Sequence, residues 1–348
     1  SPTSVALGDA FTCVVVGGVA SCVGSNALGW LGRGTRDTDP HVLPLESDVS
    51  GTIVELAAGR HHVCARRSDG TVACWGLGNH GALGVDPAGL SDCGLVAAGE
   101  AERLALDTGD TRRCAMAPVD VPGITNATGL RTGPFGTCVL RASGAPLCFG
   151  RSVGGSLGVG ATASEVVFVP TELPVADAVD VALGARHGCA IDGLARTLCF
   201  GLHDLGQLGV GSSAPDTCDA QPCAVDAVRV TELADASVVV AGDDHTCVLV
   251  DAGVLRCFGS DSIGQVGNSA GAVDGCSGVP CARTPRDAAQ IEGVARIVAA
   301  GDHSVIIAAN GKPMAFGSNA FRECASSNPD PMIAWPQEIY GISPEPRP

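Results

Sequence analysis

The sequence has few basic residues and contains no transmembrane run. Its 21 Lys and Arg residues face 37 Asp and Glu residues, which gives a formal net charge of −16. Proteins that bind a nucleic-acid backbone or an anionic membrane through charge need clustered Lys and Arg. The composition therefore predicts no nucleic-acid partner and no membrane span, and it favours cationic or neutral partners. The chain begins Ser-Pro-Thr-Ser and shows no signal peptide, so we interpret it as a mature or trimmed form.

Helical periodicity and catalytic signatures are also missing. Short apolar runs broken by Gly, Asp, Asn and Pro predict an all-β protein. We find no paired-carboxylate, phosphate-loop or metalloprotease signature. The sequence therefore predicts a protein that is not an enzyme and that holds neither a cofactor nor a metal ion.

Cysteine, in contrast, is abundant, and its spacing repeats. Among the 17 cysteines, five pairs lie nine or ten residues apart, each around a short turn that contains Gly. Residues equidistant from a hairpin turn face each other across the two strands, close enough for a disulfide to bridge them. Each pair is therefore predicted to join the strands of its own hairpin. The five pairs are Cys13–Cys22, Cys64–Cys74, Cys138–Cys148, Cys189–Cys199 and Cys247–Cys257.

Most of the remaining cysteines also lie in local pairs, inside insertions. These predicted pairs are Cys93–Cys114, Cys218–Cys223 and Cys276–Cys281. So many local disulfides indicate an oxidising compartment, which means an extracellular, periplasmic or cell-surface location. Two alternatives stay open: a reduced cytosolic protein with buried thiols, and a zinc site formed by the four cysteines of the two shortest pairs.

The cysteine pairs belong to an internal repeat that spans nearly the whole chain. Each unit opens with an apolar strand ending in Gly, and its hairpin is followed by an aromatic or apolar residue plus Gly. In the last unit Cys324 takes the place of a core Leu, which predicts a buried free thiol. Units of about 50 to 75 residues with four short strands are typical of propeller blades. We predict one domain, residues 1–348, with six repeats at about 5–50, 51–122, 123–176, 177–235, 236–293 and 294–342, and a tail at 343–348.

Three segments, WGLGNHGALGV, FGLHDLGQLGV and FGSDSIGQVGN, carry a family resemblance. With the AAG-x-x-H pattern or close variants before them, they resemble the repeat of the regulator of chromosome condensation family, over about residues 5–342. The resemblance implies a β-propeller, and the cysteines suggest a secreted, bacterial-like branch of the family. Six units predict six blades, although seven stays open because the founding members of the family have seven. The segment PQEIYGI, Pro336 to Ile342, is predicted to complete the first blade and close the ring.

A histidine recurs two residues before the first cysteine position of four units. The favoured interpretation is a structural residue that bonds to the backbone of each blade, because a repeated position is first a requirement of the fold. A ring of metal-binding histidines is the alternative. The four residues are His62, His187, His245 and His303.

Three units carry insertions that leave the repeat at the same point, and each insertion contains its own cysteine pair. They should emerge on one face of the propeller, where the disulfides pre-organise them for a partner. The alternative is that they only cover strand ends. Three aspartates in one insertion could also be Ca²⁺ ligands, but a solvated acidic loop is favoured because their spacing is irregular. The binding-loop candidates are Asp92, Asp216, Asp219, Asp226 and Asp274, of which Asp216, Asp219 and Asp226 are these three.

Together these features predict a monomeric, non-enzymatic module, secreted or at the cell surface, that binds a protein or a surface glycan through its disulfide-closed loops. Two alternatives stay open. The family resemblance allows nucleotide exchange on a small GTPase, although the acidic charge and the disulfides weigh against it. Some other propellers are hydrolases or lyases that act at the central channel, but no catalytic constellation breaks this repeat.

Overall fold

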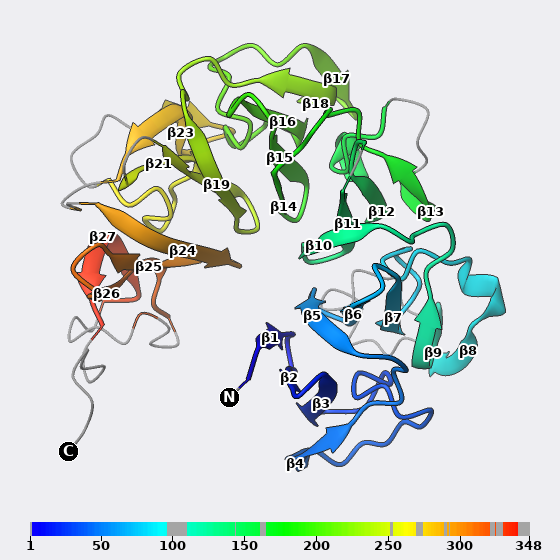
Figure 1. The fold of residues 1–348 in the computed structure, drawn as a ribbon. Helices are drawn as coiled ribbons and strands as arrows, with labels where there is room; N and C mark the ends of the chain where they lie inside the picture. Colours follow the sequence, from blue (N-terminus) through cyan, green and yellow to red (C-terminus); the bar gives the residue numbers. More distant parts are fainter. Residues whose placement is uncertain are drawn as a thin grey trace, which may run out of the picture. The chain divides into compact units, whose positions relative to one another are not determined.

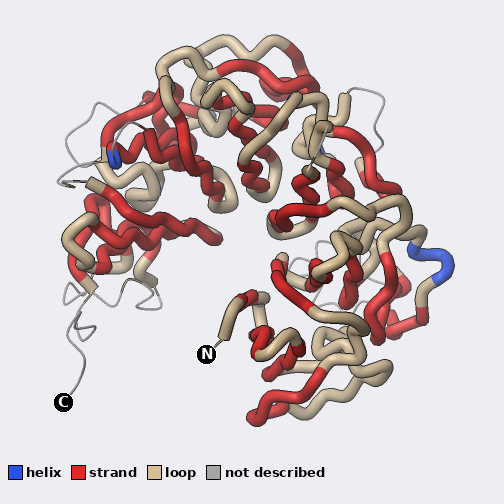
Figure 2. The backbone as a smooth tube through the Cα atoms, in the orientation of Figure 1, coloured by secondary structure: helices blue, strands red, loops and turns tan. Residues whose placement is uncertain are grey.

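The fold was analysed in a computed structural model, which describes residues 2–95, 110–142, 144–160, 165–250, 253–268, 274–288, 291, 293–320, 324 and 330–339. These residues form antiparallel β-sheets and two short 3₁₀ turns, η1 (Pro87–Gly89) and η2 (Val153–Gly155), with no α-helix among them (Figures 1 and 2). The chain divides into two compact units. Unit 1 comprises residues 1–152 and 163–173, and unit 2 comprises residues 153–162 and 174–348. No helix among the described residues is long and apolar enough to cross a membrane.

Unit 1 contains three sheets, and each lies inside one predicted repeat. The first sheet has the order β1 (Ser4–Leu7), β2 (Phe11–Val16), β3 (Val19–Gly24), β4 (His41–Glu46). The second has the order β5 (Ile53–Ala58), β6 (His62–Arg67), β7 (Val72–Leu77), β9 (Thr111–Asp120), β8 (Ser91–Leu95). The third has the order β10 (Ala127–Thr132), β11 (Gly136–Arg141), β12 (Leu147–Arg151), β13 (Val166–Glu172).

Unit 2 also contains three sheets, again one in each predicted repeat. The fourth sheet has the order β14 (Asp180–Leu183), β15 (His187–Ile191), β16 (Thr197–Leu202), β18 (Gln221–Arg229), β17 (Asp216–Cys218). The fifth has the order β19 (Ala236–Ala241), β20 (His245–Val250), β21 (Val254–Ser260), β23 (Val279–Asp287), β22 (Asp274–Cys276). The sixth has the order β24 (Val294–Ala300), β25 (His303–Ala308), β26 (Pro313–Ser318), β27 (Met332–Glu338).

Disulfides join the second and third strands of five sheets, as the spacing of the cysteines predicts. The two cysteines of each pair are directly opposite in register, for example Cys189 and Cys199. Their Cα atoms are 4.0–4.1 Å apart. In the sixth sheet Val305 and Ala315 occupy the same opposed positions without a bond. Cys324 is a buried free thiol whose Sγ lies 3.1 Å from the carbonyl oxygen of Ser318.

The prediction for the C-terminal strand was wrong. We expected PQEIYGI to complete the first blade, but β27 pairs with β26 of its own sheet, with Gln337 opposite Ala315. All four strands of the first sheet come from residues between Ser4 and Glu46. The segment is therefore the fourth strand of the sixth repeat. The part from residue 340 onward lies outside the described residues.

In four repeats the aromatic residue that follows the hairpin packs against the preceding repeat of the same unit. The ring of Phe316 lies on Gly267, where a β-carbon would be 3.0 Å from its Cδ2 and Cε2 atoms. Trp75 is fully buried, and its indole nitrogen donates to the carbonyl oxygen of Trp30 in the first sheet at 2.8 Å. These side chains are the wedges between sheets that the sequence predicts. Each unit has its own apolar core around them.

Replacing Gly264 with Ala tests how closely neighbouring sheets approach. Gly264 has φ +84°, and a β-carbon there would lie 2.6 Å from the Cα of Ala334 on β27. We expect Gly264→Ala to lower the free energy of unfolding by about 3 kcal/mol, because the backbone strain and the overlap add. Urea denaturation measures the loss. Gly311→Ala is the matched control, since Gly311 has a similar φ of +83° and no atom lies within 4 Å of its β-carbon position; equal effects of the two changes would contradict this account.

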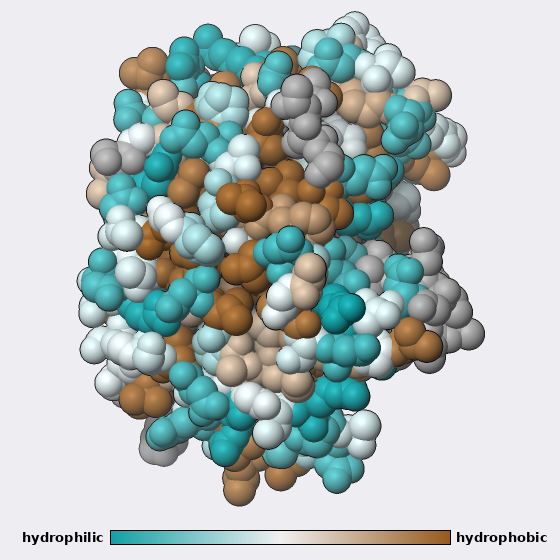
Figure 3. Space-filling model, turned by 90° about the vertical axis from the view of Figure 1, so that its right-hand side faces the viewer, coloured by the Kyte–Doolittle hydropathy of each residue, from teal (hydrophilic) through white to brown (hydrophobic). Residues whose placement is uncertain are grey.

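The fourth strand of five sheets carries a proline just before the residue that faces the third strand's cysteine position. A β-bulge lies at the same place in all six sheets. Proline lacks the N–H that would extend a ladder, and bulges twist an edge away from partners. Exposed apolar side chains such as Val42, Leu43 and Val169 lie on these strands, and Figure 3 shows hydrophobic side chains lying among polar ones on one side of the molecule. The prolines are Pro44, Pro118, Pro170, Pro285 and Pro336.

Candidate binding face

Two loops of every sheet meet at one end of its strands. One joins the first strand to the second, and the other follows the third strand. In each sheet a backbone N–H at the end of the third strand donates to a carbonyl oxygen of the first loop, at 2.8–3.0 Å. We call this end of each unit its loop face. The six donor–acceptor pairs are Ser25–Ala10, Leu77–His61, Arg151–Phe135, Leu202–Arg186, Ser260–Asp244 and Ser318–Asp302.

The insertions form hairpins on the loop face. In the fourth and fifth sheets the fifth strand, β17 or β22, pairs with the start of the fourth strand, β18 or β23. Their two-residue turns have positive φ at both positions, 47° and 63° in Asp219-Ala220 and 47° and 86° in Ser277-Gly278. Such turns match the twist of the strands that they connect. The predicted pairs Cys218–Cys223 and Cys276–Cys281 close these hairpins, and Cys93–Cys114 joins β8 to β9.

The two hairpins of unit 2 are anchored on the preceding stretch of chain. The Ser277 hydroxyl donates to the carbonyl oxygen of Asp204, which follows β16, at 3.2 Å. The Sγ of Cys218 lies 3.6 Å from the carbonyl oxygen of Gly154. Thr217 and Gly278 nevertheless remain exposed. The hairpins therefore lie on the loop face and are held near their turns, while these neighbouring residues stay open to solvent.

A cluster of charged side chains lies beside these hairpins. Arg186 pairs with Asp204 at 3.3 Å and with Asp244 at 3.0 Å, and so bridges the fourth and fifth sheets. Gln207 donates to both carboxylates, at 3.0 and 3.4 Å. Burial disfavours the charged guanidinium, but the two carboxylates outweigh it and raise the pKa of Arg186. Each carboxylate keeps oxygen lone pairs for further donors, so the cluster suits a polar partner.

Unit 1 carries a different cluster at its loop face. The guanidinium groups of Arg60 and Arg151 lie 5.5 and 5.7 Å from the centre of the Phe135 ring. His80 contacts the ring edge-on at 5.0 Å. Cations over an aromatic face attract its electron-rich surface. Neither this cluster nor the Arg186 cluster could be predicted directly from the sequence, because their members come from different repeats. The usable signal is the residue before the histidine position, which varies from unit to unit while its neighbours repeat.

The aspartates proposed from sequence have local structural roles and do not gather. Asp216 and Asp274 are equivalent, and each accepts a hydrogen bond from a backbone N–H nine residues further on, at 3.1 and 3.2 Å. Asp92 accepts from the N–H of Gly94 at 2.7 Å. Asp219 lies in the hairpin turn, and Asp226 is exposed on β18. Within the described ranges, no three His, Cys, Asp or Glu side chains lie together as metal ligands would.

Three of the recurring histidines bond to the next sheet. The Nε2 atoms of His62, His187 and His245 lie 2.8–3.0 Å from the hydroxyls of Thr137, Thr246 and Ser304 respectively. The hydroxyls of Thr137 and Thr246 donate to the carbonyl oxygens of Ala82 and Gln207. Since each hydroxyl has one proton, His62 and His187 must be the donors, which fixes their neutral tautomer. Burial, the largest cause, lowers the pKa of His62 and His245 to about 3 and that of His187 to about 4.

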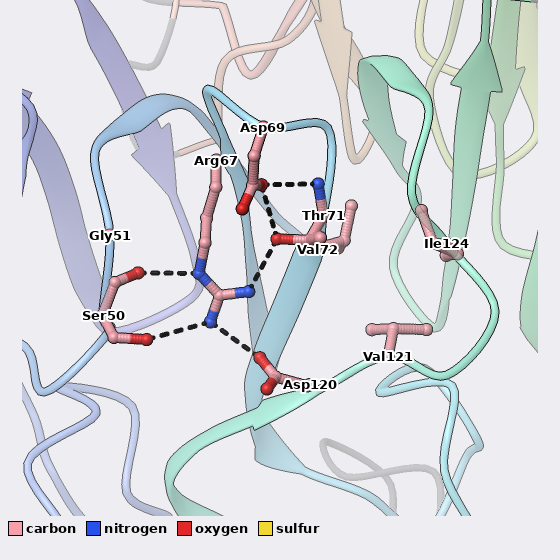
Figure 4. Close-up of a pocket in the computed structure, with 9 residues that line it drawn as sticks. All are labelled: Ser50, Gly51, Arg67, Asp69, Thr71, Val72, Asp120, Val121 and Ile124. Atoms are coloured by element: carbon pink, nitrogen blue, oxygen red, sulfur yellow. Dashed lines mark hydrogen bonds and ion pairs between the residues drawn. The ribbon is translucent and has the colours of Figure 1, made fainter.

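A pocket of 390 Å³ lies at the opposite end of the strands in unit 1 (Figure 4). Arg67 lines it: the guanidinium donates to the Ser50 carbonyl oxygen at 2.7 Å, to the Thr71 hydroxyl at 3.0 Å and to Asp120 at 2.7 Å. Asp69 in turn binds the backbone and hydroxyl of Thr71. The arginine is almost buried, and its donors are used within the protein. We call this arrangement the arginine socket, and it acts as a structural contact between the second sheet and the connection that precedes it.

Comparison with known proteins identifies the repeat. The profile of the regulator of chromosome condensation (RCC1) repeat matches residues 53–82 and 237–265. The regulator of chromosome condensation of Drosophila melanogaster is 29% identical over 165 residues, 47% of this chain and 28% of that protein. The serine/threonine-protein kinase Nek9 of Mus musculus is 29% identical over 226 residues, 60% of this chain and 21% of the kinase. The chain thus spans about a quarter of the length of such relatives.

Solved structures agree with the sequence comparison. Prp20p of Saccharomyces cerevisiae superposes with a TM-score of 0.76 at 20% identity, over 96% of this chain and 76% of that one. The structure of Prp20p is described together with its binding properties to Gsp1p and histones. Human WBSCR16 superposes with a TM-score of 0.72 at 16% identity, over 97% of this chain and 81% of that one. At these identities the likeness concerns the fold.

Proposed function

Because this chain is an RCC1-type β-propeller, we propose that it is a non-enzymatic protein-interaction module that binds a partner protein through the loop face of unit 2. The observation that carries the proposal is the pair of disulfide-closed hairpins, held near their turns beside the Arg186 cluster. A surface ordered before binding loses less conformational entropy when it meets its partner. The eight disulfides support an oxidising compartment, so the partner is extracellular, periplasmic or at the cell surface.

Opening one hairpin disulfide tests whether pre-organisation matters. We expect the double change Cys218→Ser and Cys223→Ser to weaken partner binding roughly tenfold, because the turn must then be ordered on binding. The thermal midpoint should stay within a few degrees, since the disulfides of the core hairpins remain. Isothermal titration with the purified partner and a thermal melt give the two numbers. Unchanged affinity would contradict the role of the hairpin.

Site-specific crosslinking identifies the partner and its binding surface together. A photo-reactive phenylalanine analogue at Thr217 should form an adduct with one partner protein. The same analogue at Leu194, which is 72% exposed at the opposite end of the strands in unit 2, is the control. Adducts from Leu194 but not from Thr217 would place binding elsewhere. Thr217→Arg should then lower the affinity for the captured protein roughly tenfold, while Leu194→Arg leaves it unchanged.

Nucleotide exchange on a small GTPase is the second candidate, and the sequence likeness to the Drosophila regulator of chromosome condensation supports it. A nucleotide-release assay with a panel of small GTPases separates the two. Accelerated release at catalytic concentrations of this chain would favour exchange over simple binding.

A further inference from the structure

Asn310 lies at the turn of the sixth hairpin, between β25 and β26. It is the one asparagine of the sequence that precedes a glycine. Asn310 and Gly311 are both exposed, and no atom lies within 4 Å of the place where a β-carbon of Gly311 would be. Water therefore reaches both residues, and nothing beside Gly311 shields its backbone nitrogen.

The Asn310 side chain is folded back along the chain. Its Oδ1 atom accepts a hydrogen bond from the backbone N–H of Lys312 at 3.0 Å. An asparagine side chain bonded in this way lies over the two residues that follow it, which keeps Cγ of Asn310 on the side of the Gly311 nitrogen. The same bond draws electrons from the amide carbonyl and makes Cγ a better electrophile.

The second repeat has the same turn with a carboxylate in place of the amide. Asp69 precedes Gly70 and accepts hydrogen bonds from the backbone N–H and the hydroxyl of Thr71, at 2.9 and 2.7 Å. The φ angle is +81° at Gly70 and +83° at Gly311. The bonds from Thr71 lower the pKa of Asp69, so this side chain stays ionised, and a carboxylate resists nucleophilic attack. The turn therefore tolerates an aspartate, while an asparagine in it can react.

Of the six described sheets, the sixth is the one whose hairpin has no disulfide. Val305 and Ala315 stand opposite each other there without a bond. Two backbone hydrogen bonds close the turn, from the Gly311 N–H to the Ala308 carbonyl oxygen and from the Ala308 N–H to the Lys312 carbonyl oxygen, both at 2.9 Å. A longer main chain between Ala308 and Lys312 would break these bonds, and no covalent link would then hold the two strands together.

We propose that Asn310 converts spontaneously to isoaspartate, and that this change loosens the sixth hairpin. The Gly311 nitrogen loses its proton to hydroxide and bonds to Cγ of Asn310, while the bond from Cγ to Nδ2 breaks and ammonia leaves with a proton from water. Water then opens the cyclic imide. Opening at the backbone carbonyl sends the main chain through the β-carbon and lengthens it by one atom, whereas opening at Cγ gives aspartate. The reaction needs no cofactor and does not depend on the function proposed above.

Incubation in ¹⁸O-labelled water, followed by peptide mass spectrometry, tests the reaction. At physiological temperature and mildly alkaline pH the folded, oxidised protein should take up ¹⁸O at residue 310 over weeks, faster as the pH rises. Fragmentation should assign most of the product as isoaspartate. Asn26 and Asn126, which precede alanine, should stay unlabelled.

The urea-unfolded chain is the reference for this reaction. Because the hydrogen bond of the Gly311 N–H has to open first, the unfolded chain should react faster than the folded protein. Absence of label in the folded protein, after a time that converts the unfolded chain completely, would overturn the proposal.

Two variants are the matched controls. Gly311→Ala places a methyl group beside the attacking nitrogen and should slow the uptake roughly tenfold or more. Asn310→Asp copies Asp69 and should keep the hydrogen-exchange protection of β25 and β26, whereas the aged wild type should lose it in proportion to its isoaspartate content. Unchanged uptake by Gly311→Ala would mean that Gly311 is not the nucleophile. Full protection in the aged protein would mean that the hairpin is not loosened, and either result overturns the proposal.

Discussion

Reduction of the disulfides is expected to unfold this protein at room temperature. Each core hairpin disulfide closes a loop of nine or ten residues, and closing a loop of that size stabilises a fold by about 2.7 kcal/mol in the chain-entropy description. The five loops do not overlap in the sequence, so their contributions add to about 13 kcal/mol. Folded domains are stable by only about 5–15 kcal/mol in total. The reduced chain is left with little or no net stability.

Circular dichroism and a thiol titration measure this effect. The oxidised protein should show one alkylatable thiol, Cys324, and only after denaturation, because that side chain is buried. With a phosphine reductant at neutral pH the β signal should be lost, while the same buffer without reductant is the control. A reduced chain that keeps its urea midpoint would mean that packing between sheets alone stabilises the fold.

Mild acid is expected to destabilise the oxidised protein through its three buried histidines. The folded pKa values of His62, His187 and His245, about 3, 4 and 3, lie below the ordinary value of 6.5. The unfolded chain therefore binds more protons, and stability that is fully present above pH 6.5 is lost as the pH falls toward 4 or 3. The slope is about 1.4 kcal/mol per pH unit for each histidine. Between pH 7 and pH 5 the sum reaches roughly 6 kcal/mol.

Urea denaturation at pH 7 and pH 5 provides the measurement. Burial is the main cause of each lowered pKa, and neighbouring groups modify it. His61 and His80 act on His62, and His187 and His303 act on His245. His187 is affected by Asp244, Arg186, His203 and Asp204. His187→Gln keeps an N–H donor for Thr246 and should remove about one third of the pH dependence. Burial raises the pKa of Asp261, which contributes with the opposite sign at lower pH. Equal stability at the two pH values would show that the histidines are hydrated.

Local features of this fold could be predicted from the sequence, and contacts between repeats could not. Cys247 and Cys257 face each other because both lie five residues from one turn, a relation that the spacing contains. The strand around Pro336 was assigned to the wrong sheet. The repeating sequence pattern shows the order of the strands, but it does not show which strand of the pattern is the first of a sheet. The pairing of Arg186 with Asp244 depends on the packing of two neighbouring sheets. The best sequence evidence for contacts between sheets is a position of the repeat at which the residue type varies from unit to unit.

The prolines of the fourth strands also bear on how the molecules behave in concentrated solution. In five of the six fourth strands a proline removes one backbone N–H donor at the same position. That position lies just before the residue opposite the cysteine position. A second copy that approached such a strand would find one backbone hydrogen-bond donor missing and a β-bulge beside it. Uninterrupted strand edges could otherwise pair between molecules and form fibres. With these edges interrupted, crowding should produce clear solutions of single molecules, even though nearly half of the residues are hydrophobic.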